Sequence, residues 1–183
     1  MLRELPESET MAALEFTRRY AMAHRLLATK SPKCAVPHGH NEFVTVRLQP
    51  AAPFRFSDAN STAPFEQIKR RWHAWIDEHV DHTLHLAETD PLLDYFRDRE
   101  PARLAQIMTF QGDPTTEALA ACLWLKLSAF LADDGLPFTV AEVRIEETPT
   151  NTVIVNRALL DPAACGLRPG AWPWRADMSI NDF

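Results

Sequence analysis

Alternation of apolar and polar residues predicts four β-strands in this chain. In NEFVTVRLQ, which begins at Asn41, the side chains of Val44, Val46 and Leu48 fall on one side of an extended backbone, the two-residue period of a sheet strand. Three further segments have the composition of strands: LEFTRRYAM (14–22), FTVAEVRIEE (138–147) and NTVIVNRA (151–158). The turn residues of SPKCAVPHGH connect the first two strands, and ETPT connects the last two.

Apolar residues spaced three and four positions apart predict two amphipathic helices. The first follows the irregular stretch 49–64, and its apolar stripe consists of Phe65, Ile68, Trp72, Trp75, Ile76 and His79. The second is predicted to begin with Asp113 as N-cap and Pro114 in the first turn. Its buried face consists of Leu119, Cys122, Leu123, Leu127 and Phe130. The expected order is strand, strand, helix, helix, strand, strand.

Two segments show neither the two-residue period of a strand nor the three-to-four-residue period of a helix. Residues 86–112 could hold a short helix and a strand, and residues 166–183 contain two Pro and two Trp. We expect this tail to be an extended C-terminal arm whose aromatic residues pack on a neighbour or cover a pocket. Because 183 residues with 46% hydrophobic content suffice for one core, residues 1–183 are expected to form a single domain.

Composition excludes several classes of protein. The formal net charge of -6 provides no chain-wide basic field, so nucleic acid is not an expected partner. The N-terminus MLRELPESETMAALEF lacks the apolar core of a signal peptide, and no apolar run approaches the roughly 18 residues of a membrane helix. Cys34, Cys122 and Cys165 are widely spaced, which suits free thiols in a reducing compartment. We therefore expect a soluble, cytoplasmic protein without a membrane partner.

Three histidines form a candidate metal site. His38 and His40 flank Gly39, and alternate residues of an extended strand point to the same face, so both imidazoles could bind one ion. His24 ends the preceding strand and could supply a third ligand. Three protein ligands with one open position are typical of catalytic zinc, for which imidazole is a common ligand. The alternative is that the His-x-His pair is only a polar strand end.

A cysteine lies close to these histidines in the sequence. Cys34 precedes His38 by four residues, and Lys30 and Lys33 would favour its thiolate if they approach it. The alternative is an ordinary loop thiol.

Two further groups have the chemistry of an acid–base site. Asp81 directly precedes His82, and an aspartate that orients a histidine can form a proton relay with a thiol such as Cys34. Spacing alone does not place the cysteine beside the histidine. Glu146 and Glu147 end a predicted strand, where a carboxylate could accept two parallel hydrogen bonds from an amino-pyrimidine edge, although acids at strand ends are usually solvated.

Five segments together resemble the 6-pyruvoyl-tetrahydropterin synthase and 6-carboxy-tetrahydropterin synthase family, between about residues 16 and 155. In order along the chain they are AMAHRL with His24, KCAVPHGHNEFVTV, WIDEHVDHTL, PTTEALA and RIEETPT. The resemblance implies an α+β tunnelling fold, with an antiparallel four-stranded sheet and two helices on one face. It also implies a homo-oligomer, a hexamer in this family, whose sheets join into a barrel with active sites shared between neighbours.

The resemblance also assigns roles to the candidate residues. Zn2+ would be bound by His24, His38 and His40, proton transfer would fall to Cys34, Asp81 and His82, and Glu147 would anchor the pterin ring. The implied substrate is 7,8-dihydroneopterin triphosphate. The three-residue gap between Cys34 and His38 resembles the 6-carboxy branch, which makes a queuosine precursor with loss of triphosphate and acetaldehyde. Alternatives are the 6-pyruvoyl branch, action on another pterin, a non-catalytic pterin-binding protein and, more distantly, a zinc hydrolase.

One segment departs from the family pattern. The family has Gly-Met-x-x-Asp-Phe-x-x-Leu-Lys where this chain has STAPFEQIK, so Pro64 stands in place of the aspartate. This change affects the expected substrate pocket more than the metal site. Basic candidates for holding the phosphates are Arg25, Lys30 and Lys33.

Overall fold

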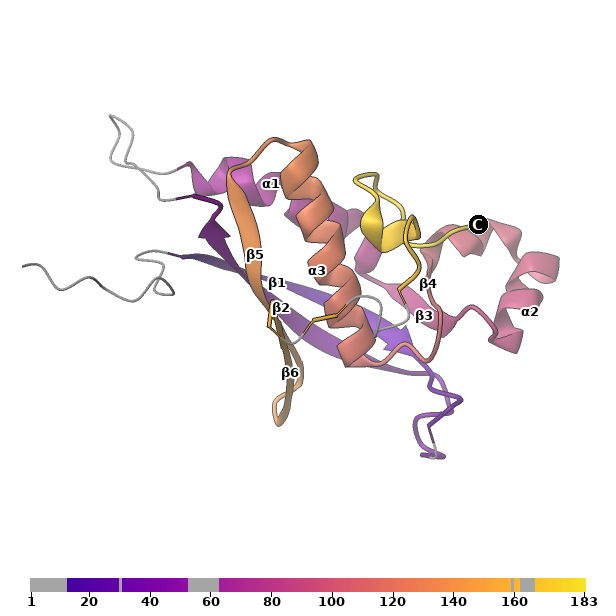
Figure 1. Cartoon of the computed structure of the whole chain (residues 1–183). Helices are drawn as coiled ribbons and strands as arrows, with labels where there is room; N and C mark the ends of the chain where they lie inside the picture. The colour runs from indigo at the N-terminus through magenta and orange to yellow at the C-terminus, as the bar shows by residue number, and fades with distance from the viewer. Residues whose placement is uncertain (1–12, 30, 53–62, 159, 162–166) are drawn as a thin grey trace, which may run out of the picture.

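One mixed β-sheet runs through the molecule, with helices packed on one of its faces (Figure 1). The structure is a computed structural model that describes residues 13–29, 31–52, 63–158, 160–161 and 167–183. The elements are β1 (Leu14–His24), β2 (His38–Pro50), α1 (Phe65–Trp75), the π-helical turn η1 (Ile76–Val80), β3 (Thr83–Ala87), α2 (Pro91–Arg99), the 3-10 helix η2 (Pro101–Gln106), β4 (Ile107–Phe110), α3 (Thr116–Asp133), β5 (Phe138–Thr148), β6 (Asn151–Asn156) and the 3-10 helix η3 (Trp172–Trp174).

The sheet has six strands in the order β4-β3-β1-β2-β5-β6. Strands β1, β2, β5 and β6 pair antiparallel, whereas β3 is parallel to β1 and β4 is parallel to β3. The α+β class and the four predicted strands are confirmed, but the prediction of a purely antiparallel four-stranded sheet is wrong. The element order also differs, because β3, α2 and β4 stand between the two expected helices.

The strand β3 escaped prediction, and β4 matches the strand expected without a position within residues 86–112, because neither strand alternates. All four residues of β4 are buried, as are four of the five residues of β3. Parallel strands covered on both faces have no polar face that a two-residue period could reveal. The helix α2 provides the crossover that a parallel pair requires.

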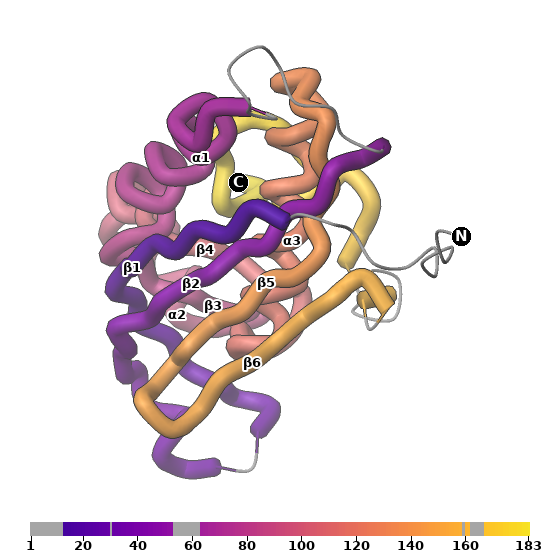
Figure 2. The backbone as a smooth tube through the Cα atoms, turned by 90° about the vertical axis from the view of Figure 1, so that its left-hand side faces the viewer, coloured from indigo at the N-terminus to yellow at the C-terminus, as the bar shows by residue number. Residues whose placement is uncertain are grey.

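The helix-facing side of the sheet forms the core. Phe16, Tyr20 and Met22 of β1 and Val44 and Val46 of β2 are buried under α1 and α3. The opposite face is open, and Figure 2 shows the antiparallel strands lying in front of the helices. Among the described residues, no helix is long and apolar enough to cross a membrane.

Both predicted helices are present with adjusted ends. In α1 and η1 the predicted stripe is buried at Ile68, Trp72, Trp75 and Ile76, but Phe65 is about half exposed and His79 is not buried. The N-cap of α3 is Thr115, whose hydroxyl accepts a hydrogen bond from the Ala118 amide, and not Asp113 as predicted. Cys122 is buried in α3, as expected.

The C-terminal segment 167–183 folds back onto its own chain beside α3 (Figure 1). Trp172 of η3 is buried, and its indole N–H donates to the Thr109 carbonyl at 2.8 Å. The amide of Thr109 donates to the Ile180 carbonyl at 3.2 Å. Backbone groups at the outer edge of β4, which would otherwise be open to pairing, are thus satisfied by the tail. Cys165 lies outside the described residues.

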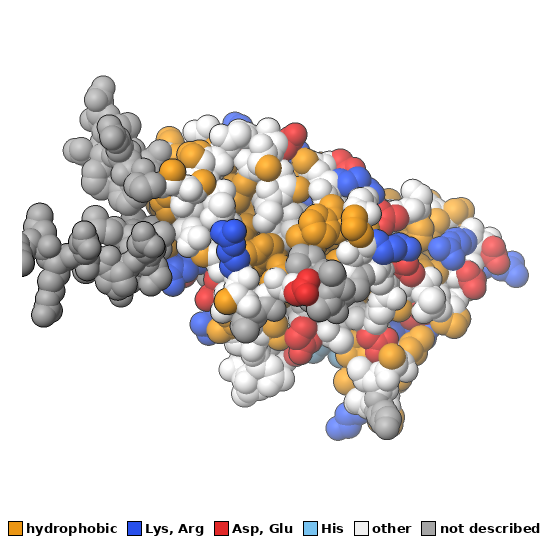
Figure 3. All heavy atoms as spheres, in the orientation of Figure 1, with side chains coloured by type: hydrophobic (Ala, Val, Ile, Leu, Met, Phe, Trp, Pro, Cys, Tyr) orange, Lys and Arg blue, Asp and Glu red, His pale blue; other side chains and the backbone are white. Residues whose placement is uncertain are grey.

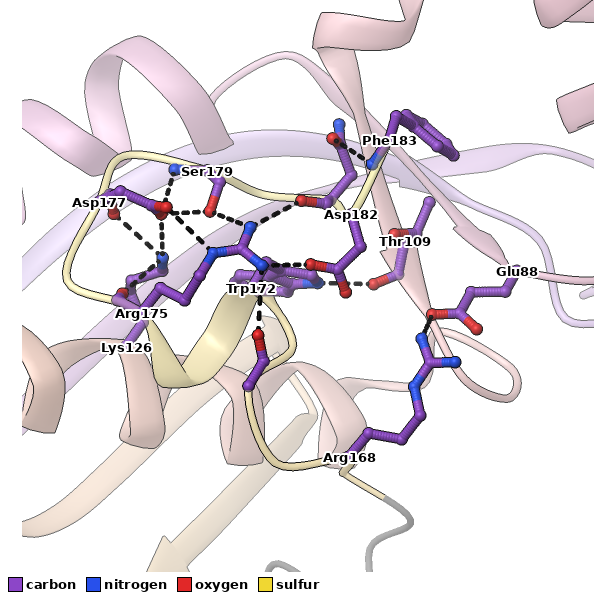
Figure 4. A network of polar contacts seen from close by, with 12 residues as sticks. Glu88, Thr109, Lys126, Arg168, Trp172, Arg175, Asp177, Ser179, Asp182 and Phe183 are labelled. Carbon is purple, nitrogen blue, oxygen red and sulfur yellow. Dashed lines mark hydrogen bonds and ion pairs between the residues drawn. The ribbon is translucent and has the colours of Figure 1, made fainter.

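A buried lysine connects α3 to this tail (Figure 4). The Nζ of Lys126 donates to the carbonyls of Arg175 and Asp177, at 2.9 and 3.1 Å, and lies 3.5 Å from the Asp177 carboxylate. The rings of Trp75, Phe130 and Trp172 surround the ammonium group at 5.5–5.7 Å from their centroids. Burial lowers the pKa of Lys126 to about 8, although the Asp177 carboxylate opposes this shift.

The pKa of Lys126 predicts how stability depends on pH. Between the folded pKa of about 8 and the ordinary value of 10.5, the unfolded chain binds the proton and the folded chain has released it. Stability therefore rises with pH across this window, by on the order of 3 kcal/mol in the free energy of unfolding. Lys126→Met should abolish this rise, measured by urea denaturation at several pH values. Lys69→Met, which alters a partly exposed lysine of α1, should show the same dependence of unfolding free energy on pH as the parent. If the unfolding free energies of the parent and Lys126→Met depend on pH in the same way, the prediction is wrong.

Candidate metal centre and active site

The register of β1 and β2 brings the three predicted histidines together. His24 lies opposite His38, and His40 lies opposite Met22, so all three imidazoles gather at one end of the strand pair. Their ring centroids are 4.6–5.2 Å apart, and one ligand atom from each lies within 4.8 Å of the others. Across the described part of the chain, no other group of three His, Cys, Asp or Glu residues forms such a cluster.

Gly39 allows the two strands to approach closely between the histidines. A Cβ atom at this position would lie 2.6 Å from the Met22 carbonyl oxygen, which is closer than real Cβ atoms are found. The glycine of the His-Gly-His segment is therefore required by the packing of β1 on β2. A side chain here would separate the strands and spread the three imidazoles.

Hydrogen bonds orient two of the rings for metal binding. The Nδ1 of His24 lies 2.9 Å from the Pro114 carbonyl, and the Nδ1 of His38 lies 2.9 Å from the Val36 carbonyl. Because carbonyls only accept, each Nδ1 carries the proton and each Nε2 presents a lone pair. Burial lowers the pKa of His24 and favours the neutral imidazole that binds metals.

Either a proton or a metal ion between the two nitrogens would satisfy both lone pairs. The Nε2 atoms of His24 and His38 are 3.1 Å apart, and two acceptors at that distance repel each other. A tetrahedral zinc with bonds of about 2.0–2.1 Å would place two ligand nitrogens about 3.3 Å apart. The donor set and its spacing therefore fit zinc.

Asp113 supports the metal site from a distance in the sequence. Its carboxylate accepts hydrogen bonds from the backbone amides of Leu27, Ala28 and Thr29, at 2.8–3.0 Å. These bonds fix the loop that follows His24, and the next residue, Pro114, presents the carbonyl that orients the His24 ring. Three amides of the loop, and not the start of α3, are the partners of this carboxylate.

Arg25 is held by the segment between β3 and β4. Its guanidinium Nε donates to the Asp90 carboxylate at 2.7 Å, and a second nitrogen bonds the other carboxylate oxygen. Asp90 is buried and also accepts from the Leu92 amide at the start of α2. This pairing uses two of the five guanidinium N–H donors and offsets the charge of Arg25, which makes it a weaker phosphate ligand. Of the other predicted phosphate ligands, Lys33 is exposed and Lys30 lies outside the described residues.

A pocket of about 480 Å³ joins the metal site to Glu147. His24 and Glu147 both line it, together with Thr116 and the β5–β6 hairpin residues Thr150 and Asn151. One oxygen of Glu147 accepts a hydrogen bond from the Thr116 hydroxyl at 2.5 Å. Figure 3 shows histidine at the base of a notch between this hairpin and the β1–β2 loop, with acidic side chains beside it. The structure thus places the predicted pterin anchor in the same pocket as a predicted metal ligand.

Glu42 is a buried acid that the sequence reasoning missed. It lies opposite Tyr20, whose hydroxyl donates to one carboxylate oxygen at 2.6 Å, while the other oxygen has no hydrogen-bond partner. Burial, together with the nearby charge of Glu147, raises the pKa of Glu42 to about 7, although the hydrogen bond from Tyr20 opposes this shift. The alternation in β2 could have revealed it, because Glu42 lies two residues before Val44 and therefore points to the same buried face of the sheet.

Asp81 and His82 are positioned by the edge of β1. One oxygen of Asp81 accepts from the Ala21 amide at 2.7 Å, and the other lies 2.7 Å from the His82 Nδ1. The His82 amide donates to the Ala21 carbonyl, and its φ of 61° lies in the left-handed region that residues other than glycine rarely adopt. Such backbone strain is concentrated at functional sites. The imidazole is 81% exposed.

Cys34 lies in the loop between β1 and β2. Its amide donates to the Ser31 carbonyl at 3.1 Å, its own carbonyl accepts from Leu26 at 2.7 Å, and its thiol is free and half-buried. The pocket that His82 lines contains neither Cys34 nor Glu147 among the described residues. A single chain therefore brings together the histidines and Glu147, but not the three predicted proton-transfer residues.

Comparisons with known proteins identify the family of the chain. A model of the 6-pyruvoyl tetrahydropterin synthase family matches residues 13–158. The chain belongs to this family. A relative from Halobacterium salinarum, named probable 6-carboxy-5,6,7,8-tetrahydropterin synthase, is 29% identical over 140 residues, which cover 75% of this chain and 82% of the relative.

Solved structures of distantly similar proteins share the fold. An uncharacterized protein from Wolinella succinogenes superposes with a TM-score of 0.65 at 19% identity, covering 80% of this chain and 98% of that one. The 6-pyruvoyl tetrahydropterin synthase of Caenorhabditis elegans gives a TM-score of 0.53 at 22% identity, covering 79% and 94%. The family match contains every candidate site residue and ends before the C-terminal tail.

The geometry of the three histidines predicts a metal-binding experiment. The parent should bind about one zinc ion per chain. His24→Ala removes a ligand whose ring the Pro114 carbonyl orients, so tight binding of zinc should be lost. Metal content after dialysis, measured by mass spectrometry with plasma ionisation, would report the loss. His79→Ala, outside the cluster, should retain the parent stoichiometry. Equal zinc content in His24→Ala and the parent would contradict the assignment.

Proposed function

We propose that this protein is a zinc-dependent carbon–oxygen lyase of the 6-carboxy-5,6,7,8-tetrahydropterin synthase type. The substrate would be 7,8-dihydroneopterin triphosphate, converted with loss of triphosphate and acetaldehyde. The observation that carries the proposal is the pocket that His24, one of the three clustered histidines, lines together with Glu147. The name of the Halobacterium salinarum relative and the short gap between Cys34 and His38 favour the 6-carboxy product.

The imidazoles of His24, His38 and His40 would hold the zinc ion. Zinc bound there would supply Lewis-acid polarisation of the substrate's side-chain hydroxyls. The carbonyls of Pro114 and Val36 keep two of the rings in one orientation and one tautomer, so the ligands need little rearrangement when the metal binds.

Glu147 would recognise the ring of the pterin. A carboxylate can accept two parallel hydrogen bonds from the amino and ring N–H groups of an amino-pyrimidine. The Thr116 hydroxyl bonds one of the two oxygens and thereby fixes the plane of the carboxylate. The pocket volume of about 480 Å³ lies within the range of roughly 300–1,000 Å³ common for small-molecule sites.

Proton transfer by Cys34 and the Asp81–His82 pair would require a second copy of the chain. The strand β3 covers only Met22–His24 of the outer edge of β1, and β6 has β5 as its single partner. Strand β1 runs toward the metal end of the sheet and β6 runs away from it, so β1 of one copy could pair antiparallel with β6 of the next. Figure 2 shows β6 at the sheet margin.

Such a ring of subunits would complete the site. The β5–β6 hairpin, which lines the pocket of His24 and Glu147, would come to lie next to the exposed His82 of the neighbouring copy. His82 could then take or deliver a proton at the substrate, with Asp81 orienting its ring. This arrangement supports a homo-oligomer with shared sites, for which the family resemblance indicates a hexamer.

One observation favours a second candidate, a member of the family that acts on another pterin. Arg25, the predicted phosphate ligand nearest to His24 in the sequence, is paired with the buried Asp90. Together with Pro64 at the altered segment, this pairing favours a pterin substrate that carries no triphosphate.

A product assay separates these candidates. The zinc-loaded protein incubated with 7,8-dihydroneopterin triphosphate should release triphosphate, acetaldehyde and a 6-carboxy pterin, identified by liquid chromatography and mass spectrometry. A 6-pyruvoyl product would assign the other branch of the family. Binding of simpler pterins without turnover of the triphosphate would favour the second candidate, and absence of both turnover and pterin binding would refute the proposal.

Cys34→Ala tests the role of the thiol. If Cys34 transfers a proton, kcat should fall by about 100-fold or more while zinc content and pterin binding remain at the parent level. Pro32→Ala, at an exposed position of the same loop, should leave kcat unchanged. If Cys34→Ala has the activity of the parent, the thiol does not take part in catalysis.

A further inference from the structure

A second pocket lies beside His82, on the segment that joins β3 to β4. Its volume is about 210 Å³, and Phe96 of α2, Glu100 and two residues of η2, Arg103 and Gln106, form its walls. His82 directly precedes β3 and Gln106 directly precedes β4. Because these strands are parallel neighbours, the pocket occupies the end of the sheet where both strands begin. The segment 88–106 thus builds a wall next to an imidazole proposed to act in proton transfer.

The polar groups of this pocket can bind an anion. The Arg103 Nε lies 3.9 Å from a Glu100 oxygen, a long contact between two largely exposed side chains, so the guanidinium keeps its donors available. The other Glu100 oxygen accepts from the Tyr95 hydroxyl at 2.8 Å. Arg103 and the side-chain amide of Gln106 therefore provide donors around one small cavity, whereas the His82 Nδ1 already faces the Asp81 carboxylate.

The C-terminal tail braces the wall that carries Arg103. The side-chain amide of Asn181 donates to the carbonyls of Leu104 and Ile107, at 3.1 and 2.9 Å, and so fixes the backbone on the C-terminal side of Arg103. Figure 4 shows the polar network that in turn holds the tail, centred on Arg175 and its bond to Asp182. A fixed wall places the guanidinium at low conformational cost when a ligand binds.

The pocket beside His82 contains both Arg103 and Glu100, whereas the charged residues that line the pocket of His24 and Glu147 are acidic. The described lining of the latter pocket contains two carboxylates, Glu117 and Glu147, and neither Lys nor Arg. That environment suits the amino-pyrimidine ring of a pterin and repels its phosphates. A substrate that is neutral at one end and anionic at the other therefore requires a cationic group some distance from the ring.

We propose that the pocket beside His82 is a phosphate subsite, in which Arg103 binds the phosphate end of the substrate whose ring lies in the Glu147 pocket of a neighbouring copy. The proposal rests on the proposed function, because His82 links the two pockets only when the active site is shared. The planar guanidinium offers paired N–H donors that match phosphate oxygens. The Glu100 carboxylate repels phosphate and lowers the affinity of the pocket for it.

Two variants of opposite sign test the subsite in the intact oligomer. Arg103→Gln should raise KM for 7,8-dihydroneopterin triphosphate about tenfold with kcat little changed, since a charge-assisted contact to phosphate is lost. Glu100→Gln should lower KM, because it removes the repulsive carboxylate. Binding of inorganic triphosphate, measured by calorimetry, should weaken in Arg103→Gln and strengthen in Glu100→Gln, whereas binding of unphosphorylated dihydroneopterin should match the parent in both.

Arg99→Gln is the matched control, since Arg99 is an exposed arginine of the same segment and does not line the pocket. It should behave as the parent in every assay. Equal loss of triphosphate binding in Arg99→Gln and Arg103→Gln would indicate general surface charge and overturn the subsite. A change of oligomeric state in Arg103→Gln with unaltered triphosphate binding would also overturn it. The calorimetry does not depend on turnover, so an inactive parent that binds triphosphate through Arg103 would refute the proposed reaction and retain the subsite.

Discussion

The antiparallel pairing of β1 with β2 is the constraint on which the rest of the structure depends. Its register buries Tyr20 and Met22 beside Val44 and Val46, and the same register sets His24 opposite His38. Since side chains alternate with a period of two, a slip of one residue would turn the apolar residues and the imidazoles of one strand together to the face opposite that of its partner. Burial of the core and assembly of the metal site are therefore consequences of one pairing.

Segments from the second half of the chain hold this pair in place. Asp113 binds three amides of the loop after His24, and Asp90 holds Arg25 from the segment between β3 and β4. The tail in turn donates a hydrogen bond from Asn181 to that segment, and it accepts one from Lys126 of α3. Parts of the chain that carry no predicted ligand thus set how rigidly the predicted ligands are held.

The parts of the fold that could be predicted are those with local periodicity. Strands β1, β2, β5 and β6 and the helices α1 and α3 follow from two-residue and three-to-four-residue spacings, and the family resemblance drawn from five short motifs is confirmed. The strand β3 was not predicted and β4 was expected only as an unplaced strand within residues 86–112, because a strand buried on both faces has no alternation. The N-cap of α3 was misplaced because the Asp113 carboxylate binds a distant loop, which no local pattern encodes.

The sequence by itself determined the chemistry of the site: which groups are donors, that His38 and His40 share a face, and that Asp81 adjoins His82. Only the tertiary structure decided which of these groups meet. It joined His24 to a carbonyl 90 residues away, placed Glu147 in the same pocket, buried Glu42 and left Cys34 and His82 apart within one chain. The physical reason is that local spacing sets only the direction of a side chain, whereas sheet register and packing set the distance between residues far apart in the chain.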